Sequence, residues 1–139
     1  MFLDLFAGTG QIGIEALSRG AANCVFVDND PQAMALIKAN VAKLKGDNYT
    51  LIHQEAEAAL ATLSCDFDLI YIDPPYTYGK VETLLSAILA GNKLKDDGLI
   101  ILEQSITEPL ILPTGLTLYK TKKYGKTNIY YMITASLDA

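Results

Sequence analysis

The sequence lacks the features that mark a membrane, secreted or metal-binding protein. Its longest apolar runs, such as residues 99–102 and 110–112, are far shorter than the roughly 20 residues that cross a bilayer. Residues 1–6 lead into a glycine loop and show no signal peptide. The two cysteines, Cys24 and Cys65, have neither metal-ligand spacing nor the density of a disulfide scaffold. We therefore expect a cytoplasmic protein with no membrane partner and no metal.

Low-complexity tracts, internal repeats and linkers are also missing, whereas half of the 139 residues are hydrophobic. A chain of this length and composition buries one core. The sequence therefore predicts a single domain over residues 1–139.

Basic side chains are scarce, and they are unevenly placed. Residues 1–115 carry seven basic and fifteen acidic side chains, a net charge of −8, and include the only arginine, Arg19. Residues 116–131 carry four lysines and no acid, interleaved with four tyrosines. A basic patch among aromatic side chains is typical of a nucleic-acid surface, although a solvated strand face has the same composition. The lysines in question are Lys120, Lys122, Lys123 and Lys126.

The rest of the chain alternates between strand and helix patterns. We predict strands at residues 2–6, 24–27, 49–53, 67–72 and 98–103, and helices at 11–19, 31–45, 56–63 and 80–90. Asp30 is the expected N-cap of the second helix, Pro31 its first residue, and Gly46 its stop. Strands separated by helices indicate βαβ units and a parallel sheet. Residues 116–122 and 128–134 are both strand-like, and the four residues 124–127 predict a turn, so these strands form an antiparallel hairpin.

A glycine loop follows the first predicted strand. Gly8, Gly10 and Gly13 match the G-x-G-x-x-G pattern, which gains weight because a strand precedes it and a helix follows. Asp28 ends the second strand, where an acidic side chain accepts hydrogen bonds from ribose hydroxyls. These features predict a nucleoside-containing cofactor.

Asp4 helps to distinguish two such cofactors, NAD and S-adenosylmethionine. A dinucleotide brings anionic phosphates to the helix N-terminus, whereas S-adenosylmethionine carries a sulfonium cation and an ammonium group. Asp4 lies inside an apolar strand, where a carboxylate is costly to bury unless a ligand cation or loop amides partner it. We therefore predict S-adenosylmethionine, with Glu55 facing the adenine amino group or capping a helix. The full predicted set is Asp4, Phe6, Ala7, Gly8, Gly10, Asp28, Asn29, Glu55 and Ala56.

The strongest signal is Asp73-Pro74-Pro75-Tyr76, at the end of the fourth strand. The prolines fix the backbone and leave its carbonyls free to accept hydrogen bonds. An exocyclic amine of a base is a weak nucleophile, and acceptors on its N–H bonds favour the geometry in which its lone pair attacks a methyl group. We predict Asp73, Pro74 and Tyr76 as catalytic residues, with Tyr76 stacking on the base. Predicted substrate contacts are Pro75, Tyr78, Lys120, Lys122, Lys123 and Lys126; a rigid turn capped by Asp73 is the alternative.

Together the segments 3–10, 13–21, 27–30 and 73–76 resemble the RsmD family, bacterial methyltransferases that make N2-methylguanine in 16S ribosomal RNA. The resemblance implies a Rossmann-like class I S-adenosylmethionine-dependent methyltransferase: α/β, mostly parallel, with a C-terminal antiparallel hairpin. It also implies that Asp4, Gly8, Gly10 and Asp28 bind the cofactor, and that ribosomal RNA, alone or in the small subunit, is the partner. Family members usually carry several tens of residues, some of them basic, before the strand that begins here at Phe2, and this difference bears on RNA affinity.

Other functions compete with this interpretation. An amino-methyltransferase acting on adenine or cytosine, in another RNA or in DNA, would use the same Asp73 motif. DNA enzymes generally add a recognition domain, for which 139 residues leave no room. A non-catalytic cofactor-binding or RNA-binding module also stays open, whereas the Asp73 motif and the hairpin argue against an NAD-dependent oxidoreductase.

Overall fold

The computed structural model describes residues 1–134, so the predicted domain extends five residues beyond the described part. None of the helices within residues 1–134 is long and apolar enough to cross a membrane. The strands are β1 (Phe2–Leu5), β2 (Cys24–Asp28), β3 (Tyr49–His53), β4 (Phe67–Ile72), β5 (Leu94–Ser105), β6 (Leu116–Tyr124) and β7 (Thr127–Thr134). The helices are α1 (Gln11–Ser18), α2 (Pro31–Val41), α3 (Ala56–Thr62) and α4 (Val81–Ala90).

One seven-stranded sheet organises the described residues. Its strand order is β3-β2-β1-β4-β5-β7-β6. The first five strands are parallel, and β7 runs antiparallel to both β5 and β6. The predicted α/β fold with its terminal hairpin is confirmed. Because β1 lies between β2 and β4, the chain reverses its direction of travel across the sheet here, and ligands of open α/β sheets bind at such a point.

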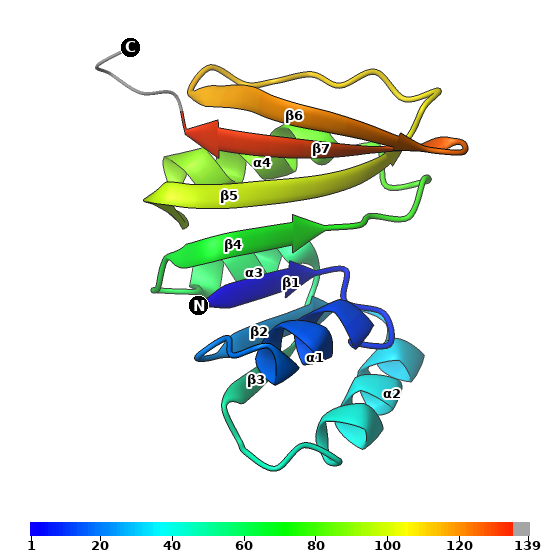
Figure 1. The fold of residues 1–139 in the computed structure, drawn as a ribbon, viewed down its shortest axis with the longest axis vertical. Coiled ribbons are helices and arrows are strands. Elements are labelled where there is room, and N and C mark those ends of the chain that lie inside the picture. Colours follow the sequence, from blue (N-terminus) through cyan, green and yellow to red (C-terminus); the bar gives the residue numbers. More distant parts are fainter. Residues whose placement is uncertain (135–139) are drawn as a thin grey trace.

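Two layers of helices cover the sheet unequally. Helices α1 and α2 lie over β1, β2 and β3 on one face, while α3 and α4 lie on the other face (Figure 1). The alternation of strand side chains explains both cores: Leu3 and Leu5 join the core under α3 and α4, whereas Phe2 and Phe26 pack under α1 and α2. Asp4 shares the face of Phe2, so its carboxyl enters the smaller core near the glycine loop.

Helix α2 begins as predicted and ends earlier. The Asp30 side chain accepts from the Gln32 amide at 3.0 Å, and Pro31 occupies the first turn. The predicted end at Gly46 is wrong, because α2 ends at Val41. Beyond it the amide of Leu44 donates to the Val41 carbonyl at 3.0 Å, a tighter turn that closes the helix.

Strands β2, β5, β6 and β7 are longer than predicted, and β1 is one residue shorter. Strand β5 begins at Leu94, not Gly98, and its pairing with β4 shifts register between Phe67 and Leu69. A Cβ at Gly98 would lie 2.6 Å from the Leu94 side chain, so glycine fits this irregular stretch better than a residue with a side chain. Tyr124 and Thr127, predicted within the turn, pair as the last residues of β6 and β7 and leave Gly125 and Lys126 as the turn.

Candidate functional site

The glycine loop between β1 and α1 is built by unusual backbone angles. Gly8 has φ 62°, a left-handed conformation that side chains with a Cβ rarely adopt. Phe6 has φ 60° without that freedom, which marks a strained residue beside the loop. Gly13 serves packing, because a Cβ there would lie 2.3 Å from the Phe26 ring. The loop is therefore held close to β2.

Asp28 ties this loop to the end of β2. Its carboxylate accepts from the amide of Gly8 at 2.9 Å and from the amide of Asp30 at 2.9 Å. A carboxylate offers about four lone-pair positions, so acceptor capacity remains for ligand hydroxyls. Asp28 thus has a structural role in addition to the ribose contact predicted for it.

Asp4 is the one charged side chain among the buried residues of the described chain, with 1% of its surface exposed. Burial raises its pKa to about 7, the amide of Gly13 offsets part of the rise, and the nearby charges of Asp73 and Asp28 add to it. Its Oδ2 atom has no hydrogen-bond partner in the part of the chain that the structure describes. An orphaned buried carboxylate oxygen beneath the glycine loop fits a cationic ligand such as S-adenosylmethionine.

A cavity of about 650 Å³, the glycine-loop cavity, opens above these strands. It is within the size range of small-molecule sites. Three of the predicted cofactor residues, Asp4, Ala7 and Gly10, do not line it and instead shape the strand and loop beneath it. Six others do: Phe6, Gly8, Asp28, Asn29, Glu55 and Ala56.

Glu55 and Tyr78 form the far wall of this cavity. Glu55 precedes α3 without making a side-chain capping hydrogen bond, which leaves its carboxylate available. The Tyr78 hydroxyl donates to Glu57 Oε1 at 2.6 Å, and the Tyr78 ring meets Phe6 edge-on at 4.9 Å. Burial, followed by this hydrogen bond, raises the pKa of Tyr78. Tyr78 therefore lines the glycine-loop cavity and not the cavity that Tyr76 lines, although both residues were predicted to contact the substrate.

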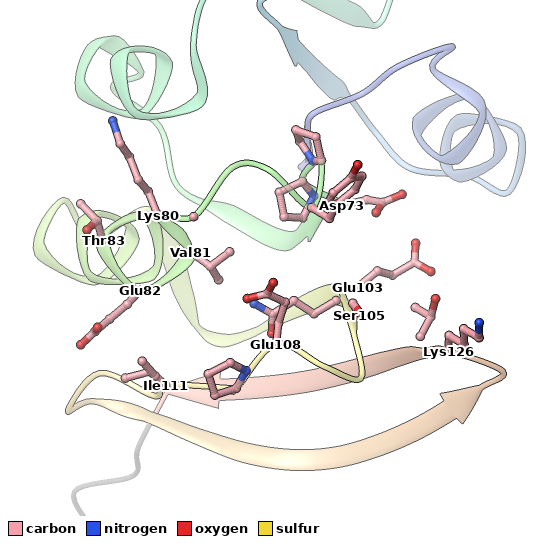
Figure 2. A pocket seen from close by; sticks show the side chains of 17 residues that line it. Asp73, Lys80, Val81, Glu82, Thr83, Glu103, Ser105, Glu108, Ile111 and Lys126 are labelled. Carbon is pink, nitrogen blue, oxygen red and sulfur yellow. The ribbon is translucent and has the colours of Figure 1, made fainter.

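A second cavity of about 400 Å³, the hairpin cavity, lies between the Asp73 segment, α4 and the β6–β7 turn (Figure 2). Five of the residues predicted to be catalytic or to contact the substrate line it: Asp73, Pro74, Pro75, Tyr76 and Lys126. Asp73, Pro74 and Pro75 also line the glycine-loop cavity, so this segment separates the two. Burial raises the pKa of Asp73. Tyr76 is 84% exposed, which leaves its ring free to stack.

The other three lysines do not reach this cavity. Lys120 and Lys122 lie on β6, with their Nζ atoms 5.8 Å and 5.9 Å from the centre of the Tyr131 ring. Lys123 is exposed one residue further along β6. Of these four lysines, only Lys126, in the hairpin turn, lines the cavity beside the Asp73 segment, so the other three are placed for contacts outside it.

Several lining residues escaped the sequence analysis. Glu103, Gln104, Ser105 and Thr83 line the hairpin cavity. Lys80, for which the sequence suggests either a phosphate contact or a surface position at a helix start, lines both cavities. The signal for Glu103 was present, because it ends the predicted fifth strand and parallel strands bring their carboxyl ends to one edge. Thr83 lies on a helix face that no sequence motif distinguishes.

Comparison with known proteins gives the family. Residues 1–133 match the family model described as "Conserved hypothetical protein 95". The chain is 33% identical to ribosomal RNA small subunit methyltransferase D of Buchnera aphidicola (subsp. Acyrthosiphon pisum), over 94% of this chain and 69% of that protein. It is 35% identical to the Haemophilus influenzae protein of the same name, over 88% of this chain and 66% of that protein.

A solved structure agrees at the level of the backbone. A conserved hypothetical protein of Streptococcus pyogenes superposes with a TM-score of 0.88 at 34% identity, covering 96% of this chain and 85% of that one. The family match spans both cavities and the Asp73 segment between them. The chain therefore belongs to the RsmD family of S-adenosylmethionine-dependent methyltransferases.

Proposed function

We propose that this chain transfers a methyl group from S-adenosylmethionine to N2 of a guanine in 16S ribosomal RNA. The observation that carries the proposal is the Asp73 segment, which lines a cavity on each side. A cofactor in the glycine-loop cavity and a base in the hairpin cavity would meet across it. The names of the Buchnera and Haemophilus relatives support ribosomal RNA as the substrate. The proposed substrate implies action in the cytoplasm, on ribosomal RNA alone or within the small subunit.

When bound, S-adenosylmethionine would supply an electrophilic methyl group, whose C–S bond would break, leaving its electron pair on sulfur, as the amine lone pair forms the N–C bond. The Asp73 carboxylate and the Pro74 carbonyl accept hydrogen bonds from the two N–H groups of N2. These bonds hold the nitrogen lone pair toward the methyl carbon. The Asp73 carboxylate then takes the proton that the methylated nitrogen loses. Such positioning and fixed charge supply most of the rate.

The cofactor's cationic end is assigned to the acidic floor of the glycine-loop cavity. The ammonium group is paired with Asp4, whose Oδ2 atom is buried and unpartnered within residues 1–134 and which lies beneath the cavity without lining it. Asp28 takes the ribose hydroxyls and Glu55 the adenine amine. Phe6 and Tyr78 provide the aromatic wall.

The test is direct identification of the product. The chain is incubated with isotope-labelled S-adenosylmethionine and small ribosomal subunits or 16S ribosomal RNA that lack the modification, and the RNA is digested to nucleosides. Mass spectrometry should find the label in N2-methylguanosine. Label in N6-methyladenosine or N4-methylcytidine would replace guanine with another base, and no labelled nucleoside would contradict methyl transfer altogether.

A further inference from the structure

Glu103 stands beside the proposed catalytic carboxylate by virtue of strand register. Strands β4 and β5 are parallel, and Ile72 pairs with Leu102 at their carboxyl ends. Asp73 and Glu103 each follow this pair, about 5 Å apart at the backbone for neighbouring strands. Alternation turns both away from the core that buries Ile72 and Leu102. Figure 2 shows the Glu103 carboxylate directed toward Asp73.

The surroundings of Glu103 leave it ready for a ligand. It lines the hairpin cavity and not the glycine-loop cavity, so it serves the side assigned to the base. It is half-buried, and burial raises its pKa, yet no hydrogen bond or ion pair involves its carboxylate within residues 1–134. The neighbouring Gln104 lines the same cavity, and its buried Oε1 atom also lacks a partner there.

Two hydrogen-bond acceptors side by side, such as Asp73 and Glu103, distinguish guanine from adenine and cytosine. On the Watson–Crick edge of guanine the N2 amine lies next to N1–H, so two adjacent positions donate. In adenine and cytosine the ring nitrogen next to the amine is an acceptor, which a carboxylate repels. A site built to bind an N–H rejects an analogue that lacks it, by up to about 10⁴–10⁵.

We propose that Glu103 is the specificity-determining residue that selects guanine, by accepting N1–H while Asp73 and Pro74 hold the N2 amine. This inference rests on the proposed function and names the residue that restricts it to one base. Glu103 takes no part in cofactor binding, so its replacement should leave S-adenosylmethionine affinity unchanged.

The experiment uses 2-aminopurine, which keeps the 2-amino group of guanine but lacks O6 and has an acceptor at N1; the loss of O6 is common to the wild type and the variant. Guanosine monophosphate and 2-aminopurine riboside monophosphate are titrated into protein saturated with S-adenosylhomocysteine, and affinities are measured by NMR. The wild type should prefer guanosine monophosphate at least about tenfold, as expected for one hydrogen bond to a charged group. In Glu103→Gln the preference should vanish or reverse, because the amide N–H donates to N1 of 2-aminopurine.

Asp97→Asn is the matched control, since it removes an exposed acid at the opposite end of the same strand. It should keep the wild-type preference for guanosine monophosphate and the wild-type rate of methyl transfer to ribosomal RNA. In Glu103→Gln that rate should fall by about tenfold or more. An unchanged preference in Glu103→Gln, or no nucleotide preference in the wild type, overturns the inference. These outcomes leave guanine methylation by the wild type intact, whereas a methyl group on another base defeats the proposed function itself.

Discussion

Acids outnumber lysines in the lining of both cavities beside the Asp73 segment, but only the hairpin cavity is bordered by the lysine-rich β6–β7 hairpin. The glycine-loop cavity belongs to the first 115 residues, with a net charge of −8, and has Asp4 and Asp28 at its base. The hairpin that borders the other cavity carries four lysines and no acid between residues 116 and 131. A sulfonium cofactor suits the first environment and an RNA backbone suits the second. The net charge of −5 is thus the sum of an acidic part, residues 1–115, and a lysine-rich hairpin, so it does not argue against RNA as a partner.

The sharpest test of the acidic side is Asp4→Asn. A pKa raised from 3.8 to about 7 means that Asp4 contributes full stability below pH 3.8, and that this contribution is lost as the pH rises to 7. The amide does not ionise, so the variant's advantage over the wild type should grow across this window, toward something on the order of 4 kcal/mol, and then level off. Chemical denaturation at pH 4 to 8 without cofactor measures it.

The same variant should bind S-adenosylmethionine more weakly, because the ligand ammonium loses its charged partner. Asp66→Asn removes an exposed acid before β4 and serves as the control for both measurements. A pH-independent difference between Asp4→Asn and the wild type would show that Asp4 is not the strained carboxylate of the cofactor side.

At the boundary between the two sides, Asp73→Ala should reduce methyl transfer by about a hundred- to a thousandfold and leave cofactor affinity nearly unchanged. The expected loss, about 3–4 kcal/mol, follows from removal of one preorganised hydrogen-bonding group in a catalytic site. Asp73→Asn should fall between, since an amide oxygen accepts without charge. Single-turnover kinetics with calorimetry of cofactor binding measures both quantities. Joint loss of stability and cofactor affinity would instead identify Asp73 as a structural cap.

For the basic side, Lys120, Lys122, Lys123 and Lys126 are replaced together by Gln. Each lost phosphate contact should reduce the slope of log affinity against log salt by roughly one, so the full effect is up to about four. Restoring Lys126 alone tests the turn lysine that lines the hairpin cavity. If RNA affinity keeps its salt dependence in the fourfold variant, the hairpin is a solvated strand face.

The smallest effect is expected at Tyr76, which is 84% exposed and makes its contact only when a base is present. Tyr76→Ala should cost about 1–3 kcal/mol of RNA-dependent transfer, the contribution of one stacked base. Tyr76→Phe keeps the ring and should behave as the wild type. A loss in Tyr76→Phe equal to that in Tyr76→Ala would assign the role to the hydroxyl.

The sequence predicted the sheet well because its strands are short apolar runs between clear breakers. Strands β3 and β4 match their predicted bounds, and Asp30 with Pro31 marked the start of α2. The end of α2 was missed because a tight turn after Val41 closes the helix before the glycine that suggested its end. The start of β5 was missed because its pairing with β4 is irregular there. Such pairing depends on the facing strand, so the local sequence of β5 does not reveal it.

Contacts between distant elements explain the rest. The Asp73 segment and the glycine loop were visible as motifs, and the structure assigns them to adjoining cavities. Tyr78 follows the Asp73 segment closely in sequence, yet its hydrogen bond to Glu57 and its contact with Phe6 turn it to the cofactor side. Which cavity Tyr78 lines thus depends on its contact with Glu57 on α3, so its position in the sequence alone does not reveal it.

The most direct test of the two-sided site is a crystal structure with S-adenosylhomocysteine and guanosine monophosphate bound together. The cofactor product should lie in the glycine-loop cavity, with its ribose on Asp28. Guanine should lie in the hairpin cavity, with N2 on Asp73 and N1 on Glu103. Guanine bound on the same side of Asp73 as the cofactor, or with N2 directed away from the sulfur, would contradict the two-sided site.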